Sequence, residues 1–217
     1  VTLRDQSGQK VAALDLSDRG PFLLCHRADL IAALAQGAQE AGVKVRTNQQ
    51  ITAAELSDSG VTLTTGTSKT RATLTIGADG GRSLLRAALL GGGEPPFTGQ
   101  VAWRALLPME EGETLPNHAQ VFMGPGRHVV AYPLRAGRLL NLVAVEETSA
   151  WTAEGWNHPG DPARLRAIFK GFGSPVRDWL ARIDTVPTWG LFKHPVARQW
   201  HAPGLALIGD AAHPTLP

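Results

Sequence analysis

The fold of this chain is constrained most by two corners. In each corner, a glycine and an aspartate lie between an apolar run and an expected helix. The first corner holds Asp79 and follows the apolar run 72–76, and the second holds Asp210 and follows the run 205–208. A glycine lets the backbone turn sharply, and a helix N-terminus offers N–H groups to phosphate. One such corner is equally well an ordinary capped turn, whereas two in one chain indicate a site for a phosphate-bearing ligand.

Hydrophobic periodicity divides the rest of the chain into α/β, mostly antiparallel β and again α/β segments. Strands are expected at 1–4, 11–16, 43–45, 61–64, 72–76, 101–107, 128–134, 139–145 and 205–208. Helices are expected at 27–42, where Gly42 is a suitable stop, and at 162–172 and 176–183. Ser83 is a suitable N-cap for a further helix after the first corner.

The residues around both corners resemble motifs of the single-component flavoprotein aromatic hydroxylases. Gly77 to Gly80, with Ser83 and Arg86, resembles the DG motif of that family, and the closing run 209–217 resembles its GD motif. A third segment, 26–34, resembles an element in which an arginine, here Arg27, opens a helix and contacts the flavin. The three segments occur in family order, closest to the branch of salicylate hydroxylase and 3-hydroxybenzoate 6-hydroxylase.

This resemblance and the order of elements predict an α/β fold class (α+β overall). A Rossmann-like FAD/NAD(P)-binding domain of the p-hydroxybenzoate hydroxylase type is expected from residues 21–98 and 198–217. An interleaved β-sheet domain that binds the substrate is expected from residues 1–20 and 99–197. The glycine-rich fingerprint Gly-x-Gly-x-x-Gly, which holds the FAD pyrophosphate, is absent from the 217 residues. The cofactor domain is therefore expected to be incomplete, and the chain to be an internal fragment.

The resemblance implies an FAD-dependent monooxygenase that hydroxylates a phenolic or aromatic carboxylate substrate with NAD(P)H and O2 through a flavin hydroperoxide. Protein side chains do not activate oxygen, so the flavin carries that step. The cofactor-binding residues implied are Arg27, Asp79, Gly80, Ser83, Gly209, Asp210 and Pro217. Two alternatives stay open: another flavoprotein oxidoreductase of the superfamily, such as an epoxidase or reductase, and a non-catalytic fragment without FAD.

Candidate catalytic and substrate-binding residues follow from strand spacing and chemistry. His128 and Tyr132 lie four residues apart on an expected strand, so both side chains should face one side of a sheet. An imidazole beside a phenol can bind and deprotonate a phenolic substrate, although a His and Tyr satisfied within the sheet remain the structural alternative. Arg104 is a candidate partner for a substrate carboxylate. His213 is expected either to line the flavin pocket or to bond the turn.

Composition excludes several other classes of function. The single cysteine, Cys25, excludes an internal disulfide framework; it indicates a reducing, cytoplasmic location and is expected to be a buried, inert thiol. The 21 basic and 19 acidic residues are interspersed, which argues against nucleic acid as a partner. The seven histidines show no ligand spacing, so no metal is expected. The expected partners are a small aromatic substrate and O2, without a membrane, and a homodimer is left open.

Overall fold

The computed structural model describes residues 1–217 except 17, 19, 21, 150–157 and 217. The chain forms two compact units, one from residues 1–42 and 99–191 and the other from residues 43–98 and 192–217. Both units are discontinuous in sequence. Residues 21–42 fall in the first unit here, whereas the sequence attaches them to the cofactor domain. The functional grouping stays a prediction.

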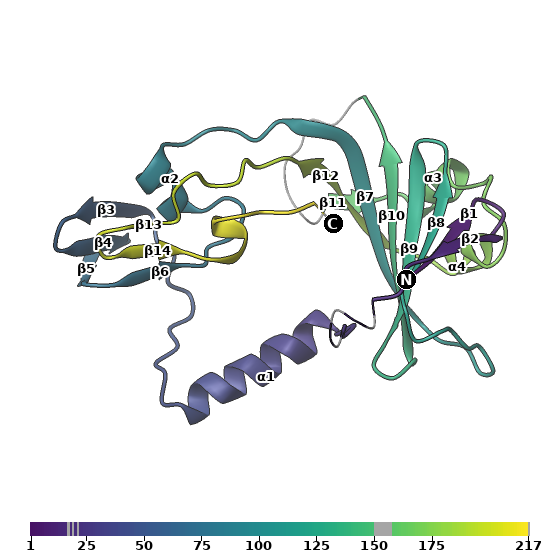
Figure 1. Ribbon diagram of the computed structural model, residues 1–217, viewed down its shortest axis with the longest axis horizontal. Coiled ribbons are helices and arrows are strands. Elements are labelled where there is room, and N and C mark those ends of the chain that lie inside the picture. Colours follow the sequence, from purple (N-terminus) through teal and green to yellow (C-terminus); the bar gives the residue numbers. More distant parts are fainter. Residues whose placement is uncertain (17, 19, 21, 150–157, 217) are drawn as a thin grey trace. The chain divides into compact units, whose positions relative to one another are not determined.

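The first unit is built on an eight-stranded sheet with the order β11-β12-β7-β10-β9-β8-β1-β2 (Figure 1). Its strands, in chain order, are β1 Thr2–Asp5, β2 Lys10–Ala13, β7 Phe97–Pro108, β8 Gln120–Gly124, β9 Arg127–Leu134, β10 Leu139–Glu147, β11 His158–Gly160 and β12 Val186–Phe192. The N-terminal hairpin joins this sheet because β1 pairs in parallel with β8. The expected hairpin and the three central strands are therefore confirmed.

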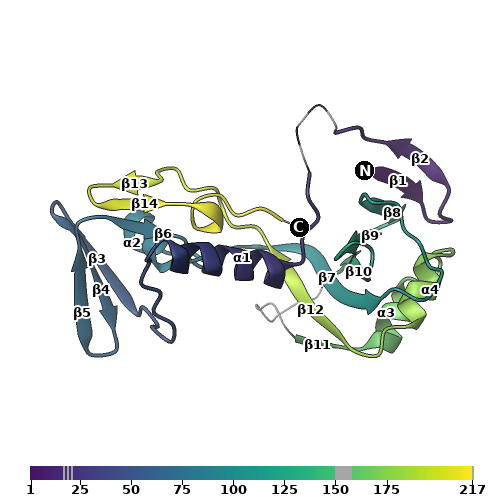
Figure 2. The ribbon, with the colours of Figure 1, turned by 90° about the horizontal axis from the view of Figure 1, so that it is seen from below.

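Two short helices, α3 (Pro162–Ile168) and α4 (Val176–Ala181), cover one face of this sheet, as Figure 2 shows. The apolar side chains at helical spacing, among them Leu165 and Trp179, are buried. The Trp179 ring meets Phe122 of β8 edge-on, with centroids 5.8 Å apart. Burying an apolar side chain of this size contributes about 1.5–3 kcal/mol. Packing of the two helices therefore buries this face of the sheet.

Helix α1 (Arg27–Glu40) confirms the helix expected before Gly42, whose positive φ of 72° ends it. The side chain of His26 caps its N-terminus by accepting a hydrogen bond from the Ala28 amide, 3.3 Å away. None of its residues is buried, and Leu34 is 64% exposed. The helix is thus set by its cap and its stop rather than by packing of its apolar stripe.

The second unit contains two three-stranded sheets, β3-β4-β5 and β13-β14-β6. Its elements are β3 Ala53–Ser57, β4 Gly60–Thr65, β5 Ser68–Ala72, β6 Thr75–Gly77, α2 Leu84–Leu90, β13 His201–Ala202, β14 Leu205–Leu207 and the 3-10 turn Gly209–Ala211. Val61, Leu85, Leu205, Leu207 and Ala212 form its core. The core joins both sheets to α2, so the two glycine–aspartate corners rest on one packed layer.

Several expected elements in this unit are wrong in extent. Residues 43–45 form no strand, and their valines are more than half exposed because no neighbouring strand pairs with them. The run 72–76 is split between β5 and β6, with Leu74 exposed at 65%. The alternation of Thr with apolar residues in 72–76 fits two short strands as well as one, so periodicity alone could not separate them.

Candidate functional site

The two corners lie side by side in the second unit. Strands β6 and β14 are parallel neighbours, with Thr75 opposite Leu205 and Gly77 opposite Leu207. The amide of Ile208 then donates to the Gly77 carbonyl at 2.9 Å, which holds the strand ends together where both turns begin. In α/β sheets, ligands bind outside the carboxyl ends of the strands. Asp79 and Asp210 are therefore brought to one candidate cofactor edge.

The first corner is organised by the Asp79 carboxylate and Ser83. The Ser83 hydroxyl donates to Asp79 Oδ1 at 2.5 Å and accepts from the Arg86 amide at 2.8 Å. The second carboxylate oxygen accepts from the Leu85 amide at 3.2 Å. Ser83 is buried and caps α2, which confirms the N-cap expected from the sequence. In this conformation, Asp79 holds the helix N-terminus as well as standing exposed at the edge.

Arg86 connects the two corners, although the sequence assigned it no separate role. Its guanidinium donates to the carbonyls of Gly81, Asp210 at 3.4 Å and Ala211 at 3.5 Å. It also lies 3.3 Å from Nδ1 of His194. Arg86 follows the N-cap Ser83 by three residues, so its side chain can turn back toward the start of the helix. This spacing was the feature of the sequence that could have indicated its role. His194 lies in a loop and carried none.

The second corner differs from its expected form. Gly209 has a φ of 56°, and Gly209–Ala211 forms a 3-10 turn where a helix was expected. Ala211 and Ala212 are fully buried, so the turn packs its small side chains into the core before a longer helix can form. Asp210 is exposed. The ring of His213 packs against Trp200, with centroids 5.0 Å apart.

The glycines of this edge leave open space beside the backbone for a dinucleotide cofactor. An added Cβ on Gly80 or Gly209 meets no atom within 4 Å, and both residues have a positive φ that L side chains rarely adopt. The backbone at both corners is therefore open to close approach by phosphate or sugar groups. The exposed Asp210 carboxylate beside it suits a hydroxyl donor. Pro217, also expected at the cofactor, lies outside the described residues.

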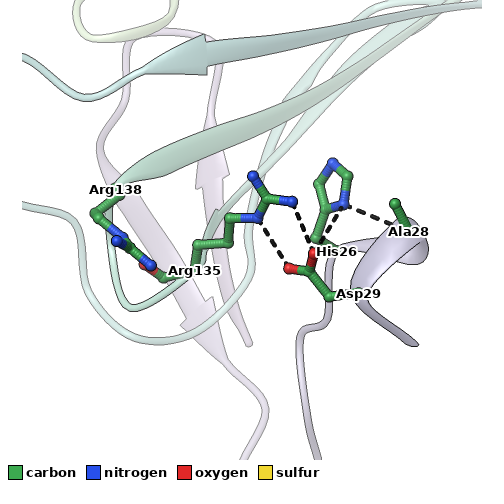
Figure 3. A network of polar contacts seen from close by, with 5 residues as sticks. All are labelled: His26, Ala28, Asp29, Arg135 and Arg138. Atoms are coloured by element: carbon green, nitrogen blue, oxygen red, sulfur yellow. Dashed lines mark hydrogen bonds and ion pairs between the residues drawn. The ribbon is translucent and has the colours of Figure 1, made fainter. Parts of the chain in front are cut away.

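In the first unit, a polar network holds the start of α1 to the turn between β9 and β10 (Figure 3). Arg135 donates from Nε and Nη2 to the two oxygens of Asp29, at 2.9 and 2.7 Å. This hydrogen bonding lowers the pKa of Asp29 and raises that of Arg135. Arg138 donates to the Arg135 carbonyl at 3.1 Å. Arg27 stands exposed beside this network, and no pattern in the sequence indicates that Arg135 reaches Asp29.

His128 and Tyr132 lie on the same side of β9, as their spacing predicts. On β10, Val145 is opposite His128 and Asn141 is opposite Tyr132. We call this side of the sheet the open face. His128 and Tyr132 are partly buried, and burial lowers the pKa of the His128 imidazole. The ring is therefore neutral near pH 7 and able to accept a proton.

Arg104 of β7 belongs to the open face as well. Val143 of β10 is opposite both Val130 of β9 and Arg104, which puts the arginine on the His128 side. Its guanidinium lies 5.6 Å from the centroid of the Trp189 ring, a cation–π contact that orients it. Leu106 on the same side is 44% exposed and Arg104 is exposed, whereas Ala102, Val143 and Val145 on this side are buried, so the face is accessible at its Arg104–Leu106 end. The three candidate substrate residues are thus brought together on one surface.

Other expected features have simpler outcomes. Cys25 is exposed rather than buried, and it lies in a segment without secondary structure, so that expectation is wrong. Trp151 and Trp156 lie outside the described residues. Among the residues that the structure describes, no three His, Cys, Asp or Glu side chains gather as a metal site. In the same residues, every helix is too short or too polar to span a membrane.

Comparison with known proteins identifies the relatives of this chain. A family model described as FAD binding domain matches residues 4–217. The 3-amino-4-hydroxybenzoate 2-monooxygenase PtnB3 of Streptomyces platensis is 35% identical over 201 residues, covering 91% of this chain and 50% of the relative. The 3-hydroxybenzoate 6-hydroxylase of Klebsiella oxytoca is 31% identical over 204 residues, covering 90% of this chain and 50% of the relative.

A solved structure agrees with these relatives. The structure titled salicylate hydroxylase substrate complex superposes with a TM-score of 0.72 at 28% identity, over 88% of this chain and 52% of that chain. The match confirms the expected fold of the p-hydroxybenzoate hydroxylase type and the family resemblance drawn from the three motifs. The chain spans about half the length of the relatives it matches.

Proposed function

We propose that the whole protein is an FAD-dependent aromatic monooxygenase. This chain belongs to the family described as FAD binding domain, and the proposal starts from that membership. The substrate of the enzyme is a hydroxylated aromatic carboxylate, its reductant is NAD(P)H and its oxidant is O2. The named activities of the relatives support the reaction class. The single observation in this chain that carries the proposal is the open face, where a neutral imidazole, a phenol and a guanidinium share one side of a sheet.

FAD, reduced by NAD(P)H, supplies the activation of O2 that no side chain provides. The corner residues are suited to hold it because two open glycines and an exposed carboxylate stand at the ends of neighbouring parallel strands. We assign to the cofactor Arg27, Asp79, Gly80, Ser83, Gly209, Asp210 and Pro217. Within this set, Ser83 acts through Asp79, since its hydroxyl is engaged by that carboxylate and by the helix amide.

The proposed reaction uses His128 to make the substrate ring more reactive. An imidazole nitrogen of His128 accepts the proton of the substrate's phenol, and the Tyr132 hydroxyl holds the resulting phenolate by a hydrogen bond. A phenolate ring is more electron-rich than a phenol and attacks an electrophilic oxygen more readily. Burial keeps the imidazole unprotonated near neutral pH, which is the state the step requires.

Arg104 orients the ring by pairing with its carboxylate. The planar guanidinium offers two parallel N–H donors that match the two carboxylate oxygens. Its contact with Trp189 restricts the side chain before the substrate arrives, so less conformational entropy is lost on binding. Arg104 and His128 therefore address two different groups on one ring, which fixes the ring position presented to the oxidant.

Mass spectrometry with isotopic oxygen tests this function. The full-length protein, loaded with FAD, is supplied with NADH or NADPH, 18O2 and one of three substrates: salicylate, 3-hydroxybenzoate or 3-amino-4-hydroxybenzoate. We expect one 18O atom in a hydroxylated product of at least one substrate. The proposed function would be wrong if NAD(P)H were oxidised without a hydroxylated product from any of the three substrates. If an alkene were epoxidised or reduced instead, the protein would belong to the alternative flavoprotein class.

A further inference from the structure

Asn141 of β10 is a buried polar residue whose amide nitrogen, Nδ2, has no hydrogen-bond partner among the described residues. The side chain is only 4% exposed. Leaving a buried donor unpaired is unfavourable, and an apolar side chain of the same size would avoid that cost. A donor kept in such a position indicates an acceptor that arrives from outside the chain.

The register of the sheet places this amide at the centre of the open face. Asn141 is opposite Tyr132 of β9 on one side and opposite Leu106 of β7 on the other. Arg104, two residues before Leu106 on the same strand, is its diagonal neighbour on the same face. Neighbouring strands are about 4.8 Å apart, so diagonal side chains remain within reach of one small ligand.

The chemistry of the neighbours identifies the acceptor. His128 and Tyr132 already serve a phenol in the proposed function, while Arg104 serves a carboxylate. An ionised carboxylate accepts about four hydrogen bonds, and the fork of one guanidinium uses only part of that capacity. The other β10 side chains on this face near Asn141, which are Leu139, Val143 and Val145, are apolar and offer no donor. The Asn141 amide is therefore the donor best placed to complete the carboxylate's coordination.

We propose that Asn141 is a substrate-binding residue that donates from Nδ2 to the carboxylate of the aromatic substrate, beside Arg104. The inference rests on the proposed function and deepens it, because it makes the enzyme selective for carboxylated over plain phenols. A half-turn of the terminal amide exchanges its oxygen and nitrogen, so the donor can be presented to a ligand without moving the strand.

Binding measurements on the full-length, FAD-loaded protein with Asn141→Leu test this assignment. Dissociation constants are measured from the change in flavin absorbance for 3-hydroxybenzoate, for salicylate and for phenol, which lacks the carboxylate. We expect the variant to bind the carboxylated ligands about 10- to 100-fold more weakly, the loss typical of a hydrogen bond to a charged group. Its affinity for phenol is expected to change less than about threefold, because phenol engages no donor at this position.

The Tm of the protein without ligand separates substrate binding from a structural role, because loss of a structural hydrogen bond would lower the Tm of Asn141→Leu. Removing an unpaired buried donor should leave Tm unchanged or raise it. Thr188→Val is the matched control, since Thr188 is buried in β12 and its hydroxyl donates to the Ala102 carbonyl at 3.0 Å. That variant should lower Tm and leave all three dissociation constants unchanged.

The outcomes separate the inference from the function on which it rests. Wild-type protein that binds none of the ligands refutes the proposed function, and the inference with it. Wild-type binding that persists unchanged in Asn141→Leu refutes the inference alone. An equal loss for phenol and the carboxylated ligands, or a fall in Tm with unchanged affinities, also overturns it, because Asn141 would then support the fold rather than read the carboxylate.

Discussion

Replacing Ser83 with alanine should loosen helix α2 and release the Asp79 carboxylate. Ser83 is 3% exposed, and its hydroxyl makes two bonds at once. It accepts from the Arg86 amide at 2.8 Å as the N-cap and donates to Asp79 Oδ1 at 2.5 Å. Ser83→Ala removes both bonds, because the methyl side chain of alanine neither donates nor accepts a hydrogen bond.

The magnitude follows from these two bonds. Loss of a serine N-cap costs about 1 kcal/mol, and loss of a hydrogen bond to a charged group costs about 1.5 kcal/mol or more. Together they predict that the free energy of opening of α2 falls by about 2 to 3 kcal/mol. At about 1.4 kcal/mol for each factor of ten, amide exchange in α2 should accelerate about 30- to 150-fold.

Hydrogen–deuterium exchange measured by mass spectrometry on peptides covering Leu84–Leu90 checks this value. Ser68→Ala is the control, because Ser68 is exposed at the start of β5 and the substitution should leave exchange in α2 unchanged. Acceleration of less than about threefold in Ser83→Ala would show that the cap does not hold the helix, and the account of the first corner would be wrong.

Three further predictions test other parts of the account. Burial lowers the pKa of the His128 imidazole from 6.5. The contribution of this neutral imidazole to stability is therefore complete above about pH 6.5 and is lost as pH falls below it. The decrease in Tm from pH 7.5 to 5.5 should be smaller in His128→Gln than in wild type. Gly209→Ala places a Cβ on a residue at positive φ, which costs about 1–2 kcal/mol, and should weaken FAD retention. The control Gly112→Ala, also at positive φ in open space, should lower stability without affecting FAD. Arg135→Gln should raise the pKa of Asp29 toward its ordinary value, measured by NMR titration, and speed amide exchange in the first turn of α1; an unchanged Asp29 pKa would refute the pairing.

Motifs with a backbone requirement were predictable from the sequence. Gly42 and Ser83 mark a helix end and a helix start because each supplies what the backbone needs at that point. Strand β9 was predictable because its sequence is rich in β-branched and aromatic residues, and the strand period of two placed His128 and Tyr132 on one side. These features depend on neighbours in sequence, and local physics decides them.

Features that depend on distant neighbours were not predictable. The guanidinium of Arg135 reaches Asp29 across more than a hundred residues, and no local pattern relates the two. Asn141 lies in an otherwise apolar run and gives no signal of its own, because its importance comes from the strands on either side. The error at Cys25 has the same origin, since burial is decided by what packs against a segment and not by the segment alone.

The flavin content of the purified full-length protein tests whether the two glycine–aspartate corners hold FAD. We expect the wild-type protein to retain FAD with the visible absorbance bands of a bound flavin, and Asp210→Ala to lose most of it while keeping the far-ultraviolet circular dichroism of a folded chain. A folded wild-type protein without flavin that takes up none from added FAD would contradict the account, as would full retention in Asp210→Ala.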